Sequence, residues 1–184
     1  YGIAVDDTTL MELYSGPEAT AHLDYLMALT GRIDNLAQSV LVDWTSGFRE
    51  TFINNSGNNA TASTDKLVND YIFYYERFLR AGKVGIPAGV FSGSPLTNLV
   101  EAPYRNDISR EFFLEALDAA QDFFNGIAYS ESGKGLSLAD YLDELEVEKS
   151  GQLLSVVINE QFDAARSLAM TLSASFSEQV SSDN

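Results

Sequence analysis

The only histidine of the chain, His22, stands four residues after Glu18, a spacing that places both side chains on one face of a helix. A Glu-x-x-x-His pair can hold a divalent ion, so Glu18 and His22 are candidate metal ligands. A zinc site usually takes three or four protein ligands, however, and the chain has no second histidine. The alternative is an i, i+4 pair near a helix start, where the charge of Glu18 also suits the helix macrodipole.

Nucleophilic catalysis has little support in the residue types. The chain has no cysteine, which excludes a disulfide framework and a thiolate metal site. His22 is the only conventional imidazole base, and the serines of Ser92-Gly93-Ser94 stand in a loop segment, not in a Gly-x-Ser-x-Gly elbow between a strand and a helix. The acidic residues of 140–148 could bind hard cations, but their helical spacing favours a solvated face. We therefore predict no catalytic residue in this chain.

Charge and length limit the function classes. The chain has 184 residues, enough for one domain or one lobe of a larger protein, and its formal net charge is -16. That charge opposes binding to nucleic acid and to anionic membranes, although acidic helix faces often serve solubility alone. No apolar run approaches the roughly 20 residues of a membrane span, so no transmembrane span is predicted. Because the chain begins at Tyr1 and not at Met, we expect a processed product or a fragment.

The elements that must position any site are helices. Apolar residues recur at three- and four-residue steps, and the pattern predicts helices over 6–14, 17–52, 63–81, 109–125, 138–145 and 153–176. Trp44 continues the apolar stripe of the second helix and is predicted to be a core residue. No alternation typical of strands is present. Amphipathic helices of this length must bury their stripes against one another, so the sequence predicts an all-α, antiparallel up-and-down bundle.

A long loop separates the two halves of this pattern. Residues 82–108 hold three of the four prolines and four of the thirteen glycines, together with several large apolar side chains. Loops of this length are uncommon in compact domains unless they are functional or disordered. Because a proline-stiffened apolar segment loses less entropy on ordering, we predict an ordered loop that packs on the helices. The side chains predicted to be buried are Val84, Ile86, Leu96, Leu99 and Val100.

The same loop carries a family resemblance. Its two ends are similar to the central loop in the C-terminal half of imelysin-like proteins, and the similarity extends over residues 21–176. The matching loop segments are Arg80-Ala81-Gly82-Lys83-Val84-Gly85-Ile86-Pro87 and Val100-Glu101-Ala102-Pro103-Tyr104-Arg105-Asn106-Asp107-Ile108-Ser109. The resemblance implies two helical lobes, of which residues 1–184 would form one, the C-terminal half. The N-terminal lobe or fragment would then be a partner of this chain.

The resemblance also implies a place for the functional residues. In the family the functional cleft lies between the lobes, and the loop could line it with Lys83, Glu101, Tyr104 and Arg105. The structural alternative is that Glu101 and Arg105 satisfy backbone groups of the loop while Tyr104 buries its ring. The Gly-x-His-x-x-Glu signature proposed for metal binding belongs to the first lobe, and the residues around His22 do not match it. No metal ligand is therefore carried over to this chain.

The function implied by the resemblance is binding in iron or haem acquisition, in an exported bacterial protein of the periplasm or outer-membrane surface, often a lipoprotein. The cofactor is unknown, with a divalent metal or iron bound together with the other lobe as the candidate. Two alternatives stay open. One is a metallopeptidase whose metal motif stands on the missing half, and the other is a structural helical interaction module.

Overall fold

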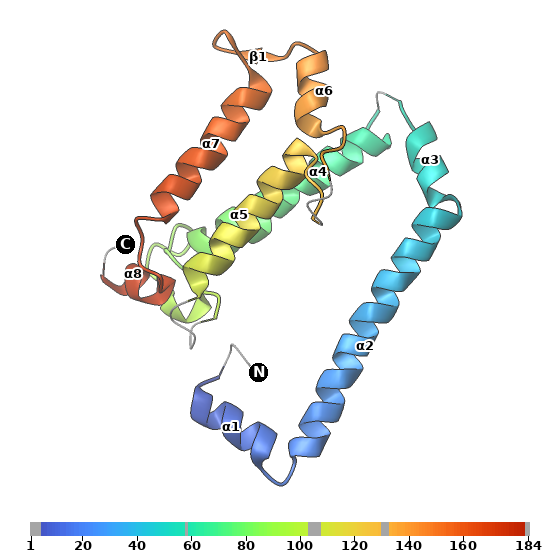
Figure 1. The fold of residues 1–184 in the computed structure, drawn as a ribbon. Helices are drawn as coiled ribbons and strands as arrows, with labels where there is room; N and C mark the ends of the chain where they lie inside the picture. The colour runs from blue at the N-terminus through green and yellow to red at the C-terminus, as the bar shows by residue number, and fades with distance from the viewer. Residues whose placement is uncertain (1–4, 58, 103–107, 130–132, 183–184) are drawn as a thin grey trace. The chain divides into compact units, whose positions relative to one another are not determined.

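The computed structural model describes residues 5–57, 59–102, 108–129 and 133–182, and almost every regular element in them is a helix (Figure 1). The prediction of an all-α fold is therefore confirmed. The chain divides into two compact units, residues 1–74 and residues 75–184, called the first unit and the second unit below. The prediction that all 184 residues form one lobe of a two-lobed protein stays a prediction.

The first unit begins with a capped helix. Helix α1 (Asp7–Ser15) starts after Asp6, whose carboxylate accepts a hydrogen bond of 3.0 Å from the backbone amide of Thr9. Helix α2 (Ala19–Asp43) follows, so it begins two residues later than the predicted start at Pro17. The unit continues through a π-helical segment, η1 (Trp44–Phe48), into α3 (Arg49–Asn54) and then α4 (Ser63–Tyr74).

The predicted helix over 17–52 is interrupted at Gly47. This residue has φ 153° and ψ -24°, a conformation that glycine adopts readily because it has no Cβ. The π-helical segment around it ends the regular ladder of α2. The rings of Trp44, Phe48 and Phe52 still gather, with the Trp44 ring 6.0 Å from Phe48 and 5.6 Å from Phe52. Trp44 is 38% exposed, so its predicted place in the core is wrong.

The second unit begins with a π-helix, η2 (Tyr75–Gly85), so the helical backbone runs past Gly82, the predicted end. A short 3-10 turn, η3 (Thr97–Leu99), precedes α5 (Ser109–Asn125). Helix α6 (Leu138–Glu144) comes next. It is followed by a hairpin of two short strands, each of two residues, that the sequence pattern did not predict. In it β1 (Glu148–Lys149) pairs antiparallel with β2 (Gln152–Leu153), Glu148 opposite Leu153. The unit ends with α7 (Leu154–Ala169) and α8 (Phe176–Ser182).

The predicted helix over 153–176 is two helices with a polar break between them. Arg110 donates through Nη1 to the carbonyl oxygen of Leu172 at 2.6 Å, and the hydroxyl of Ser109 accepts from the backbone amide of Phe176 at 2.9 Å. These side chains come from the first turn of α5. They satisfy backbone groups that a continuous helix would otherwise pair internally, and so they stabilise the break.

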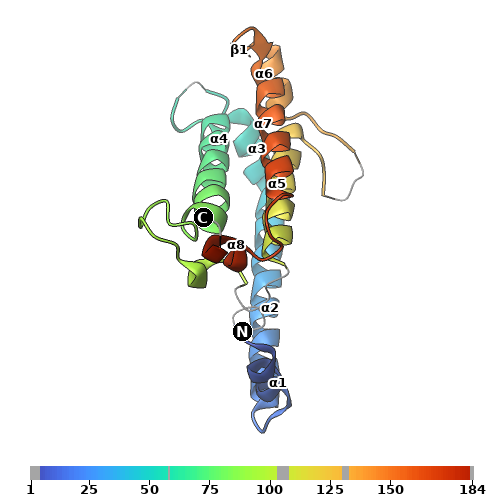
Figure 2. The ribbon, with the colours of Figure 1, turned by 90° about the vertical axis from the view of Figure 1, so that its left-hand side faces the viewer.

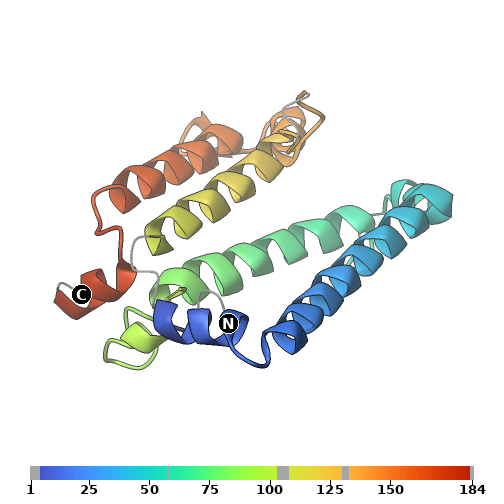
Figure 3. The same ribbon diagram turned by 60° about the horizontal axis from the view of Figure 1, so that its bottom comes forward.

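Helices α5 and α7 form the frame of the second unit. They lie side by side in Figures 1 and 3, and their side-chain contacts show that they run antiparallel. The buried apolar residues concentrate in this unit, with Leu117 fully buried, Leu79 1% exposed and Phe124 3% exposed. Within the described part of the first unit, only Ala62 and Ser63 are buried. The core that fixes the site described below therefore belongs to the second unit.

The long loop packs only in part. Val100 is 3% exposed, as predicted, whereas Val84, Ile86 and Leu96, which were also predicted to be buried, are only half-buried. Leu99 is 49% exposed, which contradicts its predicted burial, because it lies in the short turn η3. Backbone hydrogen bonds order the segment after η2, among them the amide of Leu96 to the oxygen of Pro87 at 2.8 Å. Residues 103–107 lie outside the described part of the chain.

Candidate functional site

Two of the four predicted loop residues lie together. The ammonium of Lys83, near the end of η2, forms an ion pair with a carboxylate oxygen of Glu101, eighteen residues later. The side chain of Lys83 is 18% exposed and that of Glu101 is 36% exposed, so the pair is partly shielded from water. Tyr104 and Arg105 lie outside the described residues. The pair joins the start of the long loop to its later part, and it presents one cation and one anion at a single place.

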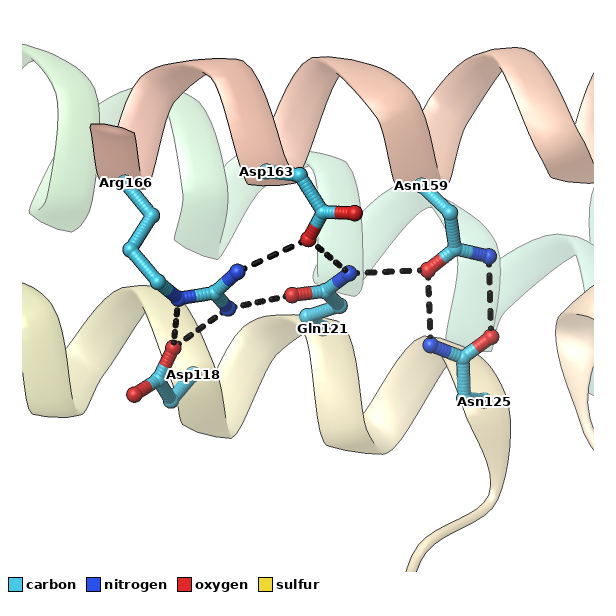
Figure 4. Close-up of polar contacts among 6 residues, drawn as sticks. All are labelled: Asp118, Gln121, Asn125, Asn159, Asp163 and Arg166. Atoms are coloured by element: carbon cyan, nitrogen blue, oxygen red, sulfur yellow. Dashed lines mark hydrogen bonds and ion pairs between the residues drawn. The ribbon is translucent and has the colours of Figure 1, made fainter. Parts of the chain in front are cut away.

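A second polar cluster joins α5 to α7 (Figure 4). Its members follow one face of each helix, three to four residues apart, so that opposing side chains meet across the helix pair. Arg166 donates through Nε to Asp118 at 2.7 Å and through Nη1 to Asp163 at 2.8 Å, and its Nη2 also contacts Gln121. We call this cluster the α5–α7 network: Asp118, Gln121, Asn125, Asn159, Asp163 and Arg166.

The amide groups of the α5–α7 network are arranged reciprocally. Asn125 donates to Asn159 at 2.8 Å, and Asn159 donates back at 3.0 Å. Gln121 donates to the same Asn159 oxygen at 2.9 Å and to Asp163 at 3.2 Å. Such mutual pairing satisfies donors and acceptors that the helix contact would otherwise leave unpaired. The network is suited to fixing the register of α5 against α7, and it presents no nucleophile with a base.

The hydrogen bonds of the network shift two pKa values. Hydrogen bonds from Gln121, and next from Arg166, lower the pKa of Asp163 below its ordinary value. The hydrogen bond to Asp118 raises the pKa of Arg166, which keeps the guanidinium protonated. Asp163 therefore contributes stability that is present above the pKa of the unfolded state, near 3.8, and that is lost as the pH falls through the folded-state pKa.

Replacing Gln121 with Ala is expected to raise the pKa of Asp163 toward its ordinary value, because the largest cause of the shift is removed. The carboxyl carbon shift of Asp163, followed by NMR from neutral to acid pH, measures this directly. Arg166→Ala should raise the same pKa, whereas Gln152→Ala, a change of the same type on the exposed β2, should not move it. An unchanged titration of Asp163 in the Gln121 variant would contradict the assignment.

Glu18 and His22 lie at the junction of α1 and α2. The backbone amide of His22 donates to the oxygen of Glu18 at 3.2 Å, and the ring of Tyr14 lies 6.2 Å from the imidazole. Both residues line one shallow pocket together with Thr9, Glu12, Leu13, Gly16 and Pro17. In the described residues no three His, Cys, Asp or Glu side chains are grouped closely enough to hold a metal ion. The metal-ligand assignment of Glu18 and His22 stays a prediction.

Sequence reasoning missed the α5–α7 network. The helices over 109–125 and 153–176 were predicted from their apolar stripes, and their polar residues were given no role. A signal was available, because Asp118, Gln121 and Asn125 share one helix face, as do Asn159, Asp163 and Arg166. The spacing does not predict which face of α7 packs against which face of α5.

Comparison with known proteins adds the family. The family model described as imelysin, peptidase M75, matches residues 6–184, which is nearly the whole chain. The chain belongs to the imelysin family. No curated protein and no solved structure gives a significant match. The match confirms the resemblance stated from the loop segments, and the family suggests a protein associated with iron uptake that is typically extracytoplasmic.

One structural finding bears on membranes. Among the residues that the structure describes, no helix is both long enough and apolar enough to pass through a bilayer.

Proposed function

We propose that this imelysin-family chain has a binding role in iron or haem acquisition outside the cytoplasm and is not catalytic on its own. The family match over residues 6–184 is the observation that carries the proposal. The residue chemistry agrees with it, because the partly shielded pair of Lys83 and Glu101 offers charge without a nucleophile.

The ion pair supports this role through its position. A carboxylate such as that of Glu101 is a hard oxygen donor that suits iron, and an ammonium such as that of Lys83 suits an anionic group such as a haem propionate. When the ion pair opens, either Lys83 or Glu101 becomes available to bind the ligand. The other side chain stays where its own segment of the loop holds it. Tyr104 and Arg105 follow Glu101 within four residues, and by residue type they extend the same set of donors.

Titration with haem and, separately, with ferric citrate tests the proposal, followed by absorbance and by calorimetry. We expect saturable binding of one of the two ligands and a loss of about tenfold in affinity for Lys83→Ala or Glu101→Ala, the effect of one charged contact. Lys149→Ala, on the exposed strand β1, is the matched control and should bind as the wild type does. The exchanged variant, Lys83→Glu with Glu101→Lys, keeps one cation and one anion that can pair. Compared with the alanine variants, it should recover the stability of the fold more fully than it recovers ligand binding.

Two results would contradict the proposal. The first is the absence of saturable binding of either ligand to the folded chain. The second is cleavage of an unfolded protein substrate that depends on a divalent metal, is stopped by a chelator and persists through further purification. The second result would favour the metallopeptidase alternative, and the matching family model is itself described as a peptidase.

A further inference from the structure

Two large apolar side chains stand at the apex of an ordered turn. Val90 is 68% exposed and Phe91 is 65% exposed, and we call this pair the apolar tip. In Figure 2 the yellow-green segment that follows η2 loops out from the helices of its own unit. The edge of the Phe91 ring lies close to Gly85, and most of the apolar surface of the pair is exposed to water.

The backbone around the apolar tip holds it in place. Val90 donates its amide to the oxygen of Gly85 at 2.9 Å, and Gly93 donates to Gly89 at 2.8 Å. Gly89 and Gly93, on either side of the tip, have φ values of +80° and +74°. The turn is therefore formed before any partner arrives, and docking of the tip carries little cost in backbone ordering.

The charge of this segment differs from that of the whole chain. Residues 77–100 contain no Asp or Glu and hold three of the eleven cationic residues, Arg77, Arg80 and Lys83. With Glu76 and Glu101 at its borders included, 76–101 has three positive and two negative charges, a net of +1, whereas the chain has a net of -16. Arg80 pairs with Glu76 and Lys83 with Glu101, so the segment presents compensated charge around an apolar apex.

We propose that the apolar tip inserts into the interfacial region of a phospholipid bilayer, with the acid-free stretch 77–100 next to the headgroups. A projecting apex needs a soft partner that closes around it, and the acyl-chain boundary of a bilayer accepts Phe and Val side chains without a preformed groove. The acid-free stretch removes local repulsion from anionic headgroups, and the many distant carboxylates are screened beyond about 8 Å at physiological ionic strength.

Co-sedimentation of the full chain with vesicles of phosphatidylcholine and phosphatidylglycerol in equal parts tests the proposal. We expect the wild type to sediment with the vesicles, and the double change Val90→Ser with Phe91→Ser to weaken vesicle binding by about tenfold or more. Leu168→Ser is the matched control, because Leu168 is 69% exposed on α7 of the same unit, and it should bind as the wild type does. Thermal melting of each variant verifies that the fold is kept.

A fluorescent reporter separates insertion from surface adsorption. The chain has one tryptophan, so Trp44→Phe combined with Phe91→Trp places the only indole at the tip. We expect its emission to shift to shorter wavelength when the vesicles are added. Vesicle binding that is unchanged in the double serine variant, or a tip tryptophan that stays in a watery environment, would overturn the proposal. The proposal would also be overturned by a double serine variant that keeps its vesicle binding but loses self-association or binding to another protein, because the tip would then contact protein and not lipid.

Discussion

Replacing Leu117 with Ala is expected to lower the free energy of unfolding of the second unit by about 3–5 kcal/mol. Leu117 is fully buried near the middle of α5, so the change removes apolar contacts and leaves a cavity that rigid neighbours cannot fill. In a chain whose total stability is of the order of 5–15 kcal/mol, this loss is a large fraction. Urea denaturation followed by circular dichroism measures it.

Leu168→Ala supplies the control for the Leu117 variant. The substitution removes the same atoms, but Leu168 is 69% exposed on α7, so the expected loss is within about 0.5 kcal/mol. A loss within about 0.5 kcal/mol in both variants would show that Leu117 does not lie in the core. A loss of more than about 2 kcal/mol in both would show instead that Leu168 is covered in solution.

Replacing Gly89 with Ala is expected to disrupt the turn that follows η2. A Cβ built on Gly89 would lie 2.3 Å from the backbone oxygen of Ser94, and the residue has a φ of +80°. The left-handed backbone costs an L residue about 1–2 kcal/mol, and the contact with a backbone atom adds about 1–3 kcal/mol that no side-chain movement can relieve. Hydrogen exchange of the Leu96 amide, which donates to Pro87 across the turn, reports the opening directly.

Gly93→Ala is the matched control for Gly89. It has a φ of +74°, close to that of Gly89, but a Cβ there would meet nothing within 4 Å. The variant should therefore show the backbone cost alone, and its Leu96 amide should exchange more slowly than in the Gly89 variant. Indistinguishable exchange in the two variants would mean that the close approach of Ser94 to Gly89 does not persist in solution.

Local residue chemistry was enough to predict several element boundaries. Ser137 stands directly before the predicted helix over 138–145, and its hydroxyl accepts from the amide of Asp140 at 3.1 Å at the start of α6. Gly126 follows the predicted helix over 109–125, and it ends α5 in the left-handed conformation with φ 69°. Caps depend on side chains within four residues, so their partners are already present in the sequence.

The predicted helix ends failed where contacts beyond the helix decide them. The apolar stripe over 153–176 continues without a break in the sequence. Helix α7 nevertheless ends at Ala169, because Arg110 and Ser109 bind the backbone of Leu172 and Phe176, 62 and 67 residues away. The apolar stripe over 17–52 is likewise continuous, although the backbone leaves the helical conformation at Gly47. The spacing of apolar residues predicts which face of a helix is buried. It does not predict which distant side chains bind the backbone in place of the next helical hydrogen bond.

The helical class of this protein, its family, the caps at Ser137 and Gly126 and the unusual character of the long loop follow from the order of the residues alone. Two features depend instead on how the chain packs: Lys83 pairs with Glu101, and six polar residues of α5 and α7 form one network. The physical reason is the range of the interactions. Helix formation and capping act over three or four residues. The Lys83–Glu101 pair and the contacts between α5 and α7 join residues eighteen to forty-eight positions apart, which come together only when the chain packs.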